Sequence, residues 1–231
     1  MSELKIRREA EKKNDLQELR TLLDNLNLDM ENHRLDRSKA DNKVVNRLEM
    51  RKPAIRPRET VNIKEFDEKK YLQELKTDLR ECNPNYKFGK EWRINCQRCV
   101  PVFEMRRRGL DVTAKPRAKG FDTLAYNPFQ VWKNPEVIKA RGNGLDDIEK
   151  NMVKWGDGAR AQVVLMWNNA PSGHTFFAER VNGKTRFYDP QNGSMDVTKY
   201  FERARPGTVS FCRIDNLKPS DKIKECYRVR V

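Results

Sequence analysis

Hydrophobic residues follow a helical pattern most clearly between residues 95 and 109. Four of them share the i, i+3, i+4, i+7 spacing of one helical face: Cys96, Cys99, Val100 and Phe103. Gly109 is a typical residue for the end of a helix, and the basic run at 106–108 suits the negative end of the helix dipole. The pattern therefore predicts a helix with a cysteine at its N-terminal end.

Other patterns predict elements on both sides of this helix. An almost uninterrupted apolar run at 159–167 predicts a strand in the centre of a sheet. Pro and Gly residues make 116–144 irregular, as in a lid, a substrate wall or an irregular packed segment. The other predicted elements are helices at 64–82, 145–155 and 197–204 and strands at 110–114, 208–214 and 228–231.

A β-hairpin is predicted over residues 174–189, because the Asn-Gly pair at 182–183 is a strong signal for a two-residue turn. In that register His174, Asp189 and Gln191 project from the same side, with the aspartate diagonal to the histidine. A carboxylate beside an imidazole fixes its tautomer and stabilises its protonated form. The alternative is a surface histidine beside an ordinary turn aspartate. We favour a catalytic pair, because His174 is the only histidine in the compact part of the chain.

The N-terminal part of the chain differs in character from the rest. Five residues form a short heptad seam: Leu16, Leu19, Leu23, Leu26 and Met30. The seam stops at His33 and Arg37, and a Pro- and Arg-rich linker follows at 52–58. We therefore expect a helical arm and linker at 1–62, either a solvated helix or a weak self-association arm, and a catalytic domain at 63–231 that folds without it.

The chain has 231 residues, of which 35% are charged and 37% hydrophobic, and a formal net charge of +14. This composition fits one modest globular domain plus a segment that buries little surface. No apolar run is long enough to span a membrane, and no signal-peptide pattern opens the chain. An odd set of five cysteines fits a reducing compartment. We expect a protein that is cytoplasmic in its producer, or one delivered into a target cell by a dedicated machine or a longer parent protein.

A cysteine at a helix N-terminus is a candidate nucleophile, because unpaired N–H groups and aligned peptide dipoles stabilise its thiolate. A structural zinc site needs four ligands, and the chain offers one Cys-x-x-Cys pair and two histidines, so we expect no metal and no cofactor. A redox motif would follow a strand, whereas residues 83–94 are polar and broken by Pro and Gly. We therefore expect a cysteine nucleophile with His174 as general base and Asp189 as its orienting group.

Either Cys96 or Cys99 can be that nucleophile. Pro101 belongs in the first turn of a helix, which moves the helix start towards Cys99, and papain also uses the second cysteine of such a pair. Cys96 would lie at the mouth of the helix, and its Asn-Cys step resembles that of ovarian-tumour-type deubiquitinases. A proline one residue too deep costs about 1 kcal/mol, whereas a buried nucleophile cannot react. We favour Cys96 and keep Cys99 as the alternative.

A set of motifs in fixed order resembles the papain-fold toxin domains of bacterial polymorphic toxin systems, which also occur in proteins of phages and mobile elements. The motifs are Asn83-Pro-Asn-Tyr, Asn95-Cys-Gln-Arg-Cys, Glu104-x-Arg-Arg-Arg-Gly, Gly173-His174-Thr and Phe187-Tyr-Asp189-Pro-Gln191. The resemblance covers roughly residues 83–215 and implies an α+β, papain-like fold. In that fold a nucleophile helix packs on an antiparallel sheet, here preceded by the helical arm.

The resemblance also implies a Cys-His-Asp hydrolase, with glutamine deamidation as the first expectation and proteolysis as the second. Backbone N–H groups at the helix start, with Asn95 and Gln191 as orienting or oxyanion-binding side chains, would complete the site. The expected partners are a protein substrate in a target cell and an acidic immunity protein, and no membrane. The alternative function is a non-catalytic module, either a basic nucleic-acid-binding protein or a phage structural or adaptor protein. Against nucleic acid, the basic residues are scattered and form no recognised motif.

Overall fold

The computed structural model describes residues 66–229. The predicted arm at 1–62, the boundary that separates it from the domain and any self-association through it therefore lie outside the described residues. Within residues 66–229, the helices predicted at 64–82, 95–109 and 145–155 appear as α2 (Glu68–Cys82), α3 (Cys96–Arg107) and α5 (Leu145–Trp155).

The helix α2 begins where Asp67 caps it, since the Asp67 carboxylate accepts a 2.9 Å hydrogen bond from the Lys70 N–H. Its buried residues recur every three or four positions: Tyr71, Leu75, Leu79 and Cys82. This face packs against α3, and the Cys82 thiol donates to the Cys99 carbonyl at 3.2 Å. The sequence prediction that this helix packs on the domain is confirmed.

The helix α3 begins at Cys96 although Pro101 lies inside it. Every residue from Gln97 to Glu104 is buried, so packing on all sides holds the helix together despite the hydrogen bond that a proline cannot make. Gly109 follows the helix with a φ of 88°, the left-handed conformation that ends many helices. The predicted helix end is confirmed.

The main sheet is antiparallel, has five strands and follows the order β2-β6-β3-β4-β5. Its strands are β2 (Ile138–Lys139), β3 (Arg160–Met166), β4 (Gly173–Val181), β5 (Lys184–Tyr188) and β6 (Ser210–Arg213). The run predicted as a central strand is β3, which lies in the middle. In the hairpin Val181 pairs with Lys184, the predicted register, and Asn182 and Gly183 both have positive φ.

Smaller elements complete the domain. The two-stranded sheet consists of β1 (Val112–Ala114) and β7 (Tyr227–Val229). The region predicted to be irregular contains only short elements: α4 (Thr123–Tyr126), the 3-10 helix η3 (Pro128–Val131) and β2. The other 3-10 helices are η2 (Lys90–Trp92), η4 (Thr198–Arg203) and η5 (Asp221–Glu225).

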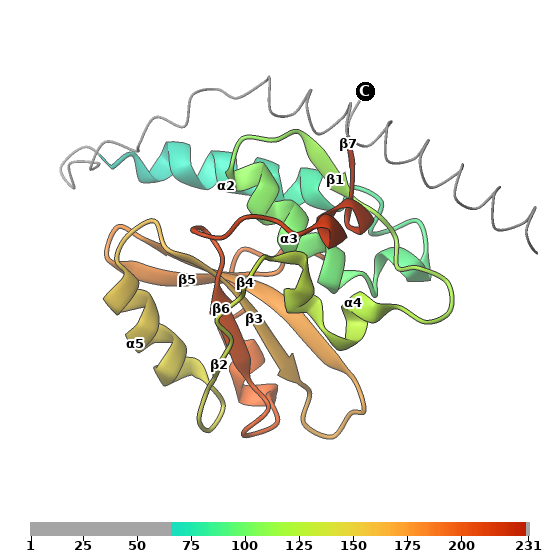
Figure 1. The fold of residues 1–231 in the computed structure, drawn as a ribbon. Helices are drawn as coiled ribbons and strands as arrows, with labels where there is room; N and C mark the ends of the chain where they lie inside the picture. The colour runs from blue at the N-terminus through green and yellow to red at the C-terminus, as the bar shows by residue number, and fades with distance from the viewer. Residues whose placement is uncertain (1–65, 230–231) are drawn as a thin grey trace, which may run out of the picture. The chain divides into compact units, whose positions relative to one another are not determined.

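Successive residues of a strand point to opposite sides of the sheet. In the main sheet both sets of side chains are buried, one in a core with α2 and α3 and the other in a core with α5. Phe177 packs at 4.7 Å from the Phe103 ring of α3, whereas its neighbour Phe176 belongs to the core on the α5 side. Phe187 meets Phe201 of η4 edge-on at 4.9 Å between ring centres on that second side. Figure 1 shows the resulting layers, with α2 and α3 on one side of the sheet and α5 on the other.

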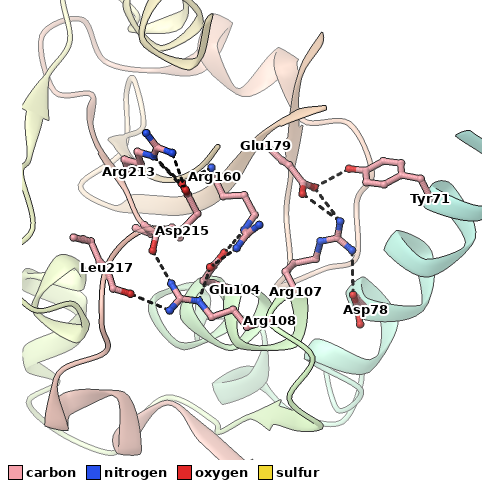
Figure 2. A network of polar contacts seen from close by, with 11 residues as sticks. Tyr71, Asp78, Glu104, Arg107, Arg108, Arg160, Glu179, Arg213, Asp215 and Leu217 are labelled. Carbon is pink, nitrogen blue, oxygen red and sulfur yellow. Dashed lines mark hydrogen bonds and ion pairs between the residues drawn. The ribbon is translucent and has the colours of Figure 1, made fainter. Parts of the chain in front are cut away.

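Buried ion pairs hold the C-terminal half of α3 against the sheet (Figure 2). Glu104 is fully buried and bonds to Arg108 at 2.7 Å and to Arg160 of β3 at 2.7 Å. The Arg108 guanidinium also donates to the carbonyls of Ile214 and Leu217. The basic run at the end of α3 therefore does more than complement the helix dipole, because Arg108 ties α3 to the segment after β6, while Glu104 ties it to β3.

A second cluster in Figure 2 joins α3 to α2 and β4. Glu179 of β4, which is 1% exposed, accepts from Arg107 at 3.2 Å and from the Tyr71 hydroxyl at 2.7 Å. The hydroxyls of Tyr71 and Tyr188 are also 2.7 Å apart. These contacts fix α3 relative to the hairpin, which sets the distance between the start of α3 and the start of β4.

Candidate active site

Cys96 is the first residue of α3, and Cys99 lies one turn further in. The Cys96 side chain is half-buried, whereas Cys99 is 0% exposed and packs beside Cys82. Burial, together with the neighbouring Cys82 thiol, raises the pKa of the Cys99 thiol well above its ordinary value. Of these two cysteines, Cys96 is the one that a substrate can reach.

His174 and Asp189 come from the two strands of the hairpin and meet at one end of it. His174 is the second residue of β4, and Asp189 follows directly after β5. The His174 Nε2 lies 3.0 Å from the Asp189 Oδ2, which leaves the His174 Nδ1 for the thiol of Cys96. Asp189 is 1% exposed and also accepts from the Gln191 N–H at 2.9 Å.

The electrostatics of the three groups favour an ion pair. Burial alone raises the pKa of the Cys96 thiol, but the charge and hydrogen bond of His174 and a bond from the Thr175 N–H bring it below its ordinary value. Burial alone lowers the pKa of His174, but Cys96 and Asp189 raise it to about 10. Burial opposes ionisation of Asp189 too, yet bonds from His174 and Tyr200 hold its pKa below the usual range. The arrangement therefore favours a thiolate paired with an imidazolium over two neutral groups.

Asn95 and Gln191 form a buried amide cluster with Asn83, which directly follows α2. The Asn95 Nδ2 donates to the Lys115 carbonyl at 3.0 Å, and its Oδ1 accepts from Gln191 Nε2 at 3.4 Å. The Asn83 Nδ2 donates to the Gln191 carbonyl at 2.8 Å. The Asn95 amide is therefore occupied by internal bonds, which hold the chain just before Cys96. The backbone N–H groups at the start of α3 remain as candidate hydrogen-bond donors to an oxyanion.

Two aromatic residues that sequence reasoning did not select surround His174. The Trp167 ring stacks on the imidazole at 5.7 Å with an interplanar angle of 20°, and the Tyr200 ring meets it edge-on at 5.6 Å. The Tyr200 hydroxyl also donates to Asp189 Oδ2 at 2.8 Å. Trp167 precedes His174 by seven residues and Tyr200 follows it by 26, and no motif around either of them signalled a role.

A third missed residue is Asp122, which is 3% exposed. Its carboxylate accepts from the Gln97 Nε2 at 2.9 Å and forms an ion pair with Arg98 at 2.6 Å. The Gln97 Oε1 in turn lies 3.7 Å from the Cys96 Sγ. Asp122 therefore anchors the loop after β1 to the first turn of α3, beside the candidate nucleophile.

The Tyr200→Phe variant tests whether Tyr200 helps to hold Asp189. We expect kcat to fall about tenfold with KM nearly unchanged, because a hydrogen bond to a buried charge contributes about 1.5–3 kcal/mol while the ring still packs on His174. Steady-state kinetics measure this. The control is Glu202→Gln, because Glu202 is an exposed residue of the same 3-10 helix. An equal effect in both variants would contradict this role.

Two features of the described residues bear on other functions. Within residues 66–229, no group of three or more His, Cys, Asp or Glu side chains is placed to hold a metal ion. In the same range, no helix combines the length and the apolar character that a membrane crossing requires.

Residues 94–194 match the family model described as papain fold toxin 1, glutamine deamidase. None of the curated proteins compared with the chain matches it. The matched segment contains Cys96, His174 and Asp189, together with α3 and the central strands of the sheet. The match gives no support to a non-catalytic nucleic-acid-binding or adaptor role. It confirms the resemblance and the α+β, papain-like fold expected from the sequence, because the segment 94–194 is similar to the papain-fold glutamine deamidase toxins.

Proposed function

We propose that the chain is a toxin that deamidates a glutamine side chain of a target-cell protein, with Cys96, His174 and Asp189 as its catalytic residues. One observation carries the proposal. A half-buried cysteine at a helix N-terminus has a lowered pKa because of a histidine that an aspartate holds at 3.0 Å, within a segment that matches glutamine deamidases.

In the first half of the reaction, the Cys96 thiolate attacks the carboxamide carbon and forms a tetrahedral intermediate. Backbone N–H groups in the first turn of α3 stabilise its oxyanion, since helix N-termini have donors without intrahelical partners. The protonated His174 gives its proton to the departing nitrogen, so ammonia leaves and a thioester remains.

In the second half, neutral His174 takes a proton from water, and the resulting hydroxide attacks the thioester carbonyl. Collapse of the second tetrahedral intermediate releases the glutamate side chain and returns the thiolate. The net change is glutamine plus water to glutamate plus ammonia. Asp189 keeps the imidazole oriented throughout, with help from Tyr200 and the Gln191 N–H.

The pH dependence of kcat/KM tests the ion pair. We expect the rate to rise with pH as Cys96 loses its proton, at a pH below the ordinary thiol pKa of about 8.5, because the pKa of Cys96 is lowered. The rate should fall again as pH passes the pKa of His174, about 10, since neutral His174 cannot protonate the leaving nitrogen. A rising limb centred above the ordinary thiol pKa would contradict the ion pair.

Mass spectrometry of proteins from a sensitive cell tests the reaction itself. Incubation with the wild-type chain should convert specific glutamines to glutamates, with ammonia released in equal amount, and Cys96→Ala should produce neither. New peptide termini in place of amide-to-acid conversion would show a protease. If the wild-type chain produced neither change in any sensitive cell tested, the proposed function would be wrong.

A further inference from the structure

A basic cleft of about 910 Å³ lies beside the N-terminal end of α3. Its walls come from η2, the start of α3, the loop after β1 and the C-terminal segment. Six cationic residues line this cleft: Lys90, Arg98, Lys115, Arg117, Lys119 and Arg228. Neither Cys96 nor the His174–Asp189 pair lines it, so the cleft is a neighbour of the candidate catalytic site and not the site itself.

Several of these cations keep their charge available to a ligand. Arg98 is neutralised by Asp122 at 2.6 Å, and the Lys115 Nζ donates to a backbone carbonyl. Lys90 and Lys119 are exposed and form no ion pair among residues 66–229. Arg228, also exposed, contacts the Trp92 ring at 5.9 Å, a contact that keeps its charge. The available charge is therefore positive.

Exposed apolar side chains accompany the charge. Ile94 lines the cleft and is 38% exposed. Phe121, next to the cleft residue Gly120, is 75% exposed and stacks on Tyr126, which is equally exposed, at 5.0 Å. Exposed aromatic residues with charged neighbours are typical of protein-binding surfaces, in which the aromatic side chains act as anchors.

The cleft is close enough to Cys96 to hold the same substrate. Ile94 and Arg98 line the cleft, and Cys96 lies two residues from each of them. Two residues span at most about 7 Å, which is the length of a short stretch of peptide. A bound segment can therefore lie in the cleft while a glutamine near it reaches the thiol.

We propose that the basic cleft binds an acidic segment of the substrate protein, next to the glutamine that Cys96 attacks. This inference rests on the proposed deamidase function and names the chemistry of its substrate. A polypeptide fits better than a nucleic acid, because the carboxylates of Glu91 and Glu225 also line the cleft and would repel a continuous run of phosphates. In an acidic peptide the carboxylates are separated by apolar side chains. This spacing matches the protein surface, where the cations of the cleft lie among Ile94 and the neighbouring Phe121.

Binding and turnover of two synthetic peptides test the cleft. Each peptide has one glutamine, flanked in one by glutamates and in the other by lysines. Fluorescence anisotropy of the labelled peptides is measured with the full chain carrying Cys96→Ser, so that binding is read without turnover. We expect the glutamate-flanked peptide to bind at least about tenfold more tightly, with the difference shrinking as salt is raised.

The double variant Lys90→Glu/Lys119→Glu should reduce this preference about tenfold or more, both in binding and in the kcat/KM ratio of the two peptides. Lys184→Glu is the matched control, since Lys184 is exposed at the opposite end of the hairpin from His174 and should leave the preference unchanged. Unfolding midpoints show whether each variant is folded.

Three results would overturn the inference: no preference in the wild-type chain, an equal loss in the control, or a single-stranded RNA oligonucleotide that binds at the cleft more tightly than the acidic peptide. The proposed function can fail separately. In one outcome, the double variant loses glutamate-dependent binding while the wild-type chain deamidates no glutamine. That pair of results would support the cleft as a binding site for acidic peptides and would contradict the deamidase proposal.

Discussion

Replacing Cys96 by alanine is expected to lower kcat for deamidation by about 10⁴-fold or more. A triad enzyme that loses its nucleophile keeps only substrate binding and oxyanion stabilisation, and losses of this order or larger follow. Cys96 is half-buried at the start of α3, and its pKa is lowered, because His174 counters the effect of burial. Release of ammonia from a glutamine peptide measures the loss.

Cys99→Ala is the matched control for this experiment. Cys99 is 0% exposed beside Cys82, and burial raises its pKa well above the ordinary value, so its thiol should neither react nor titrate near neutral pH. We expect Cys99→Ala to retain activity within a few-fold. Labelling with iodoacetamide at mildly acidic pH should disappear in Cys96→Ala and persist in Cys99→Ala. The reverse pattern in both assays would make Cys99 the nucleophile.

Glu104→Ala is expected to lower the free energy of unfolding by about 3–5 kcal/mol, because it removes one partner of a buried ion-pair network and leaves buried charges uncompensated. Glu104 is 0% exposed, and its carboxylate contacts both Arg108 and Arg160, of which Arg160 has a side chain 12% exposed. Urea unfolding followed by circular dichroism at neutral pH measures the change. A loss below about 1 kcal/mol, the typical contribution of a surface pair, would contradict the role assigned to Glu104.

Two further variants make the Glu104 experiment interpretable. Glu202→Ala removes an exposed carboxylate and should leave the unfolding midpoint nearly unchanged. Glu104→Gln keeps the size of the side chain and part of its hydrogen bonding, so it should fall between Glu104→Ala and wild type. If Glu104→Ala does not fold, the comparison rests on Glu104→Gln.

Periodic patterns in the sequence were enough to predict the elements that carry the site. The i, i+3, i+4, i+7 spacing after Asn95 predicted α3, and the Asn-Gly turn predicted the hairpin register that places His174 beside Asp189. Both predictions depend on neighbours in the chain or across one turn, and local periodicity is strong for such pairs. The order of motifs was enough to identify the papain-like fold.

Contacts between distant segments could not be read in this way. Asp122 contacts the site from the loop after β1, Tyr200 from η4 and Trp167 from just after β3, and no pattern specified these contacts. Asn95 was predicted to be an orienting or oxyanion-binding group, and no sequence pattern indicated that its amide bonds to Asn83, Gln191 and the Lys115 carbonyl. How a short polar side chain is paired depends on what packs against it, and only the folded chain decides that.

The sequence by itself was enough to predict the longer helices and strands among residues 66–229, the residue types that can perform the chemistry and the position of a cysteine at the N-terminal end of α3. Only the tertiary structure shows that Cys96 is half-buried and Cys99 fully buried, because accessibility depends on how α2 covers α3. It also decided that the charges of Glu104 and Glu179 are buried, although in the sequence they look like surface residues. The physical reason is that burying a charge is costly unless an opposite charge pairs with it. In this domain the partner comes from another element, so the pairing depends on how the whole domain packs.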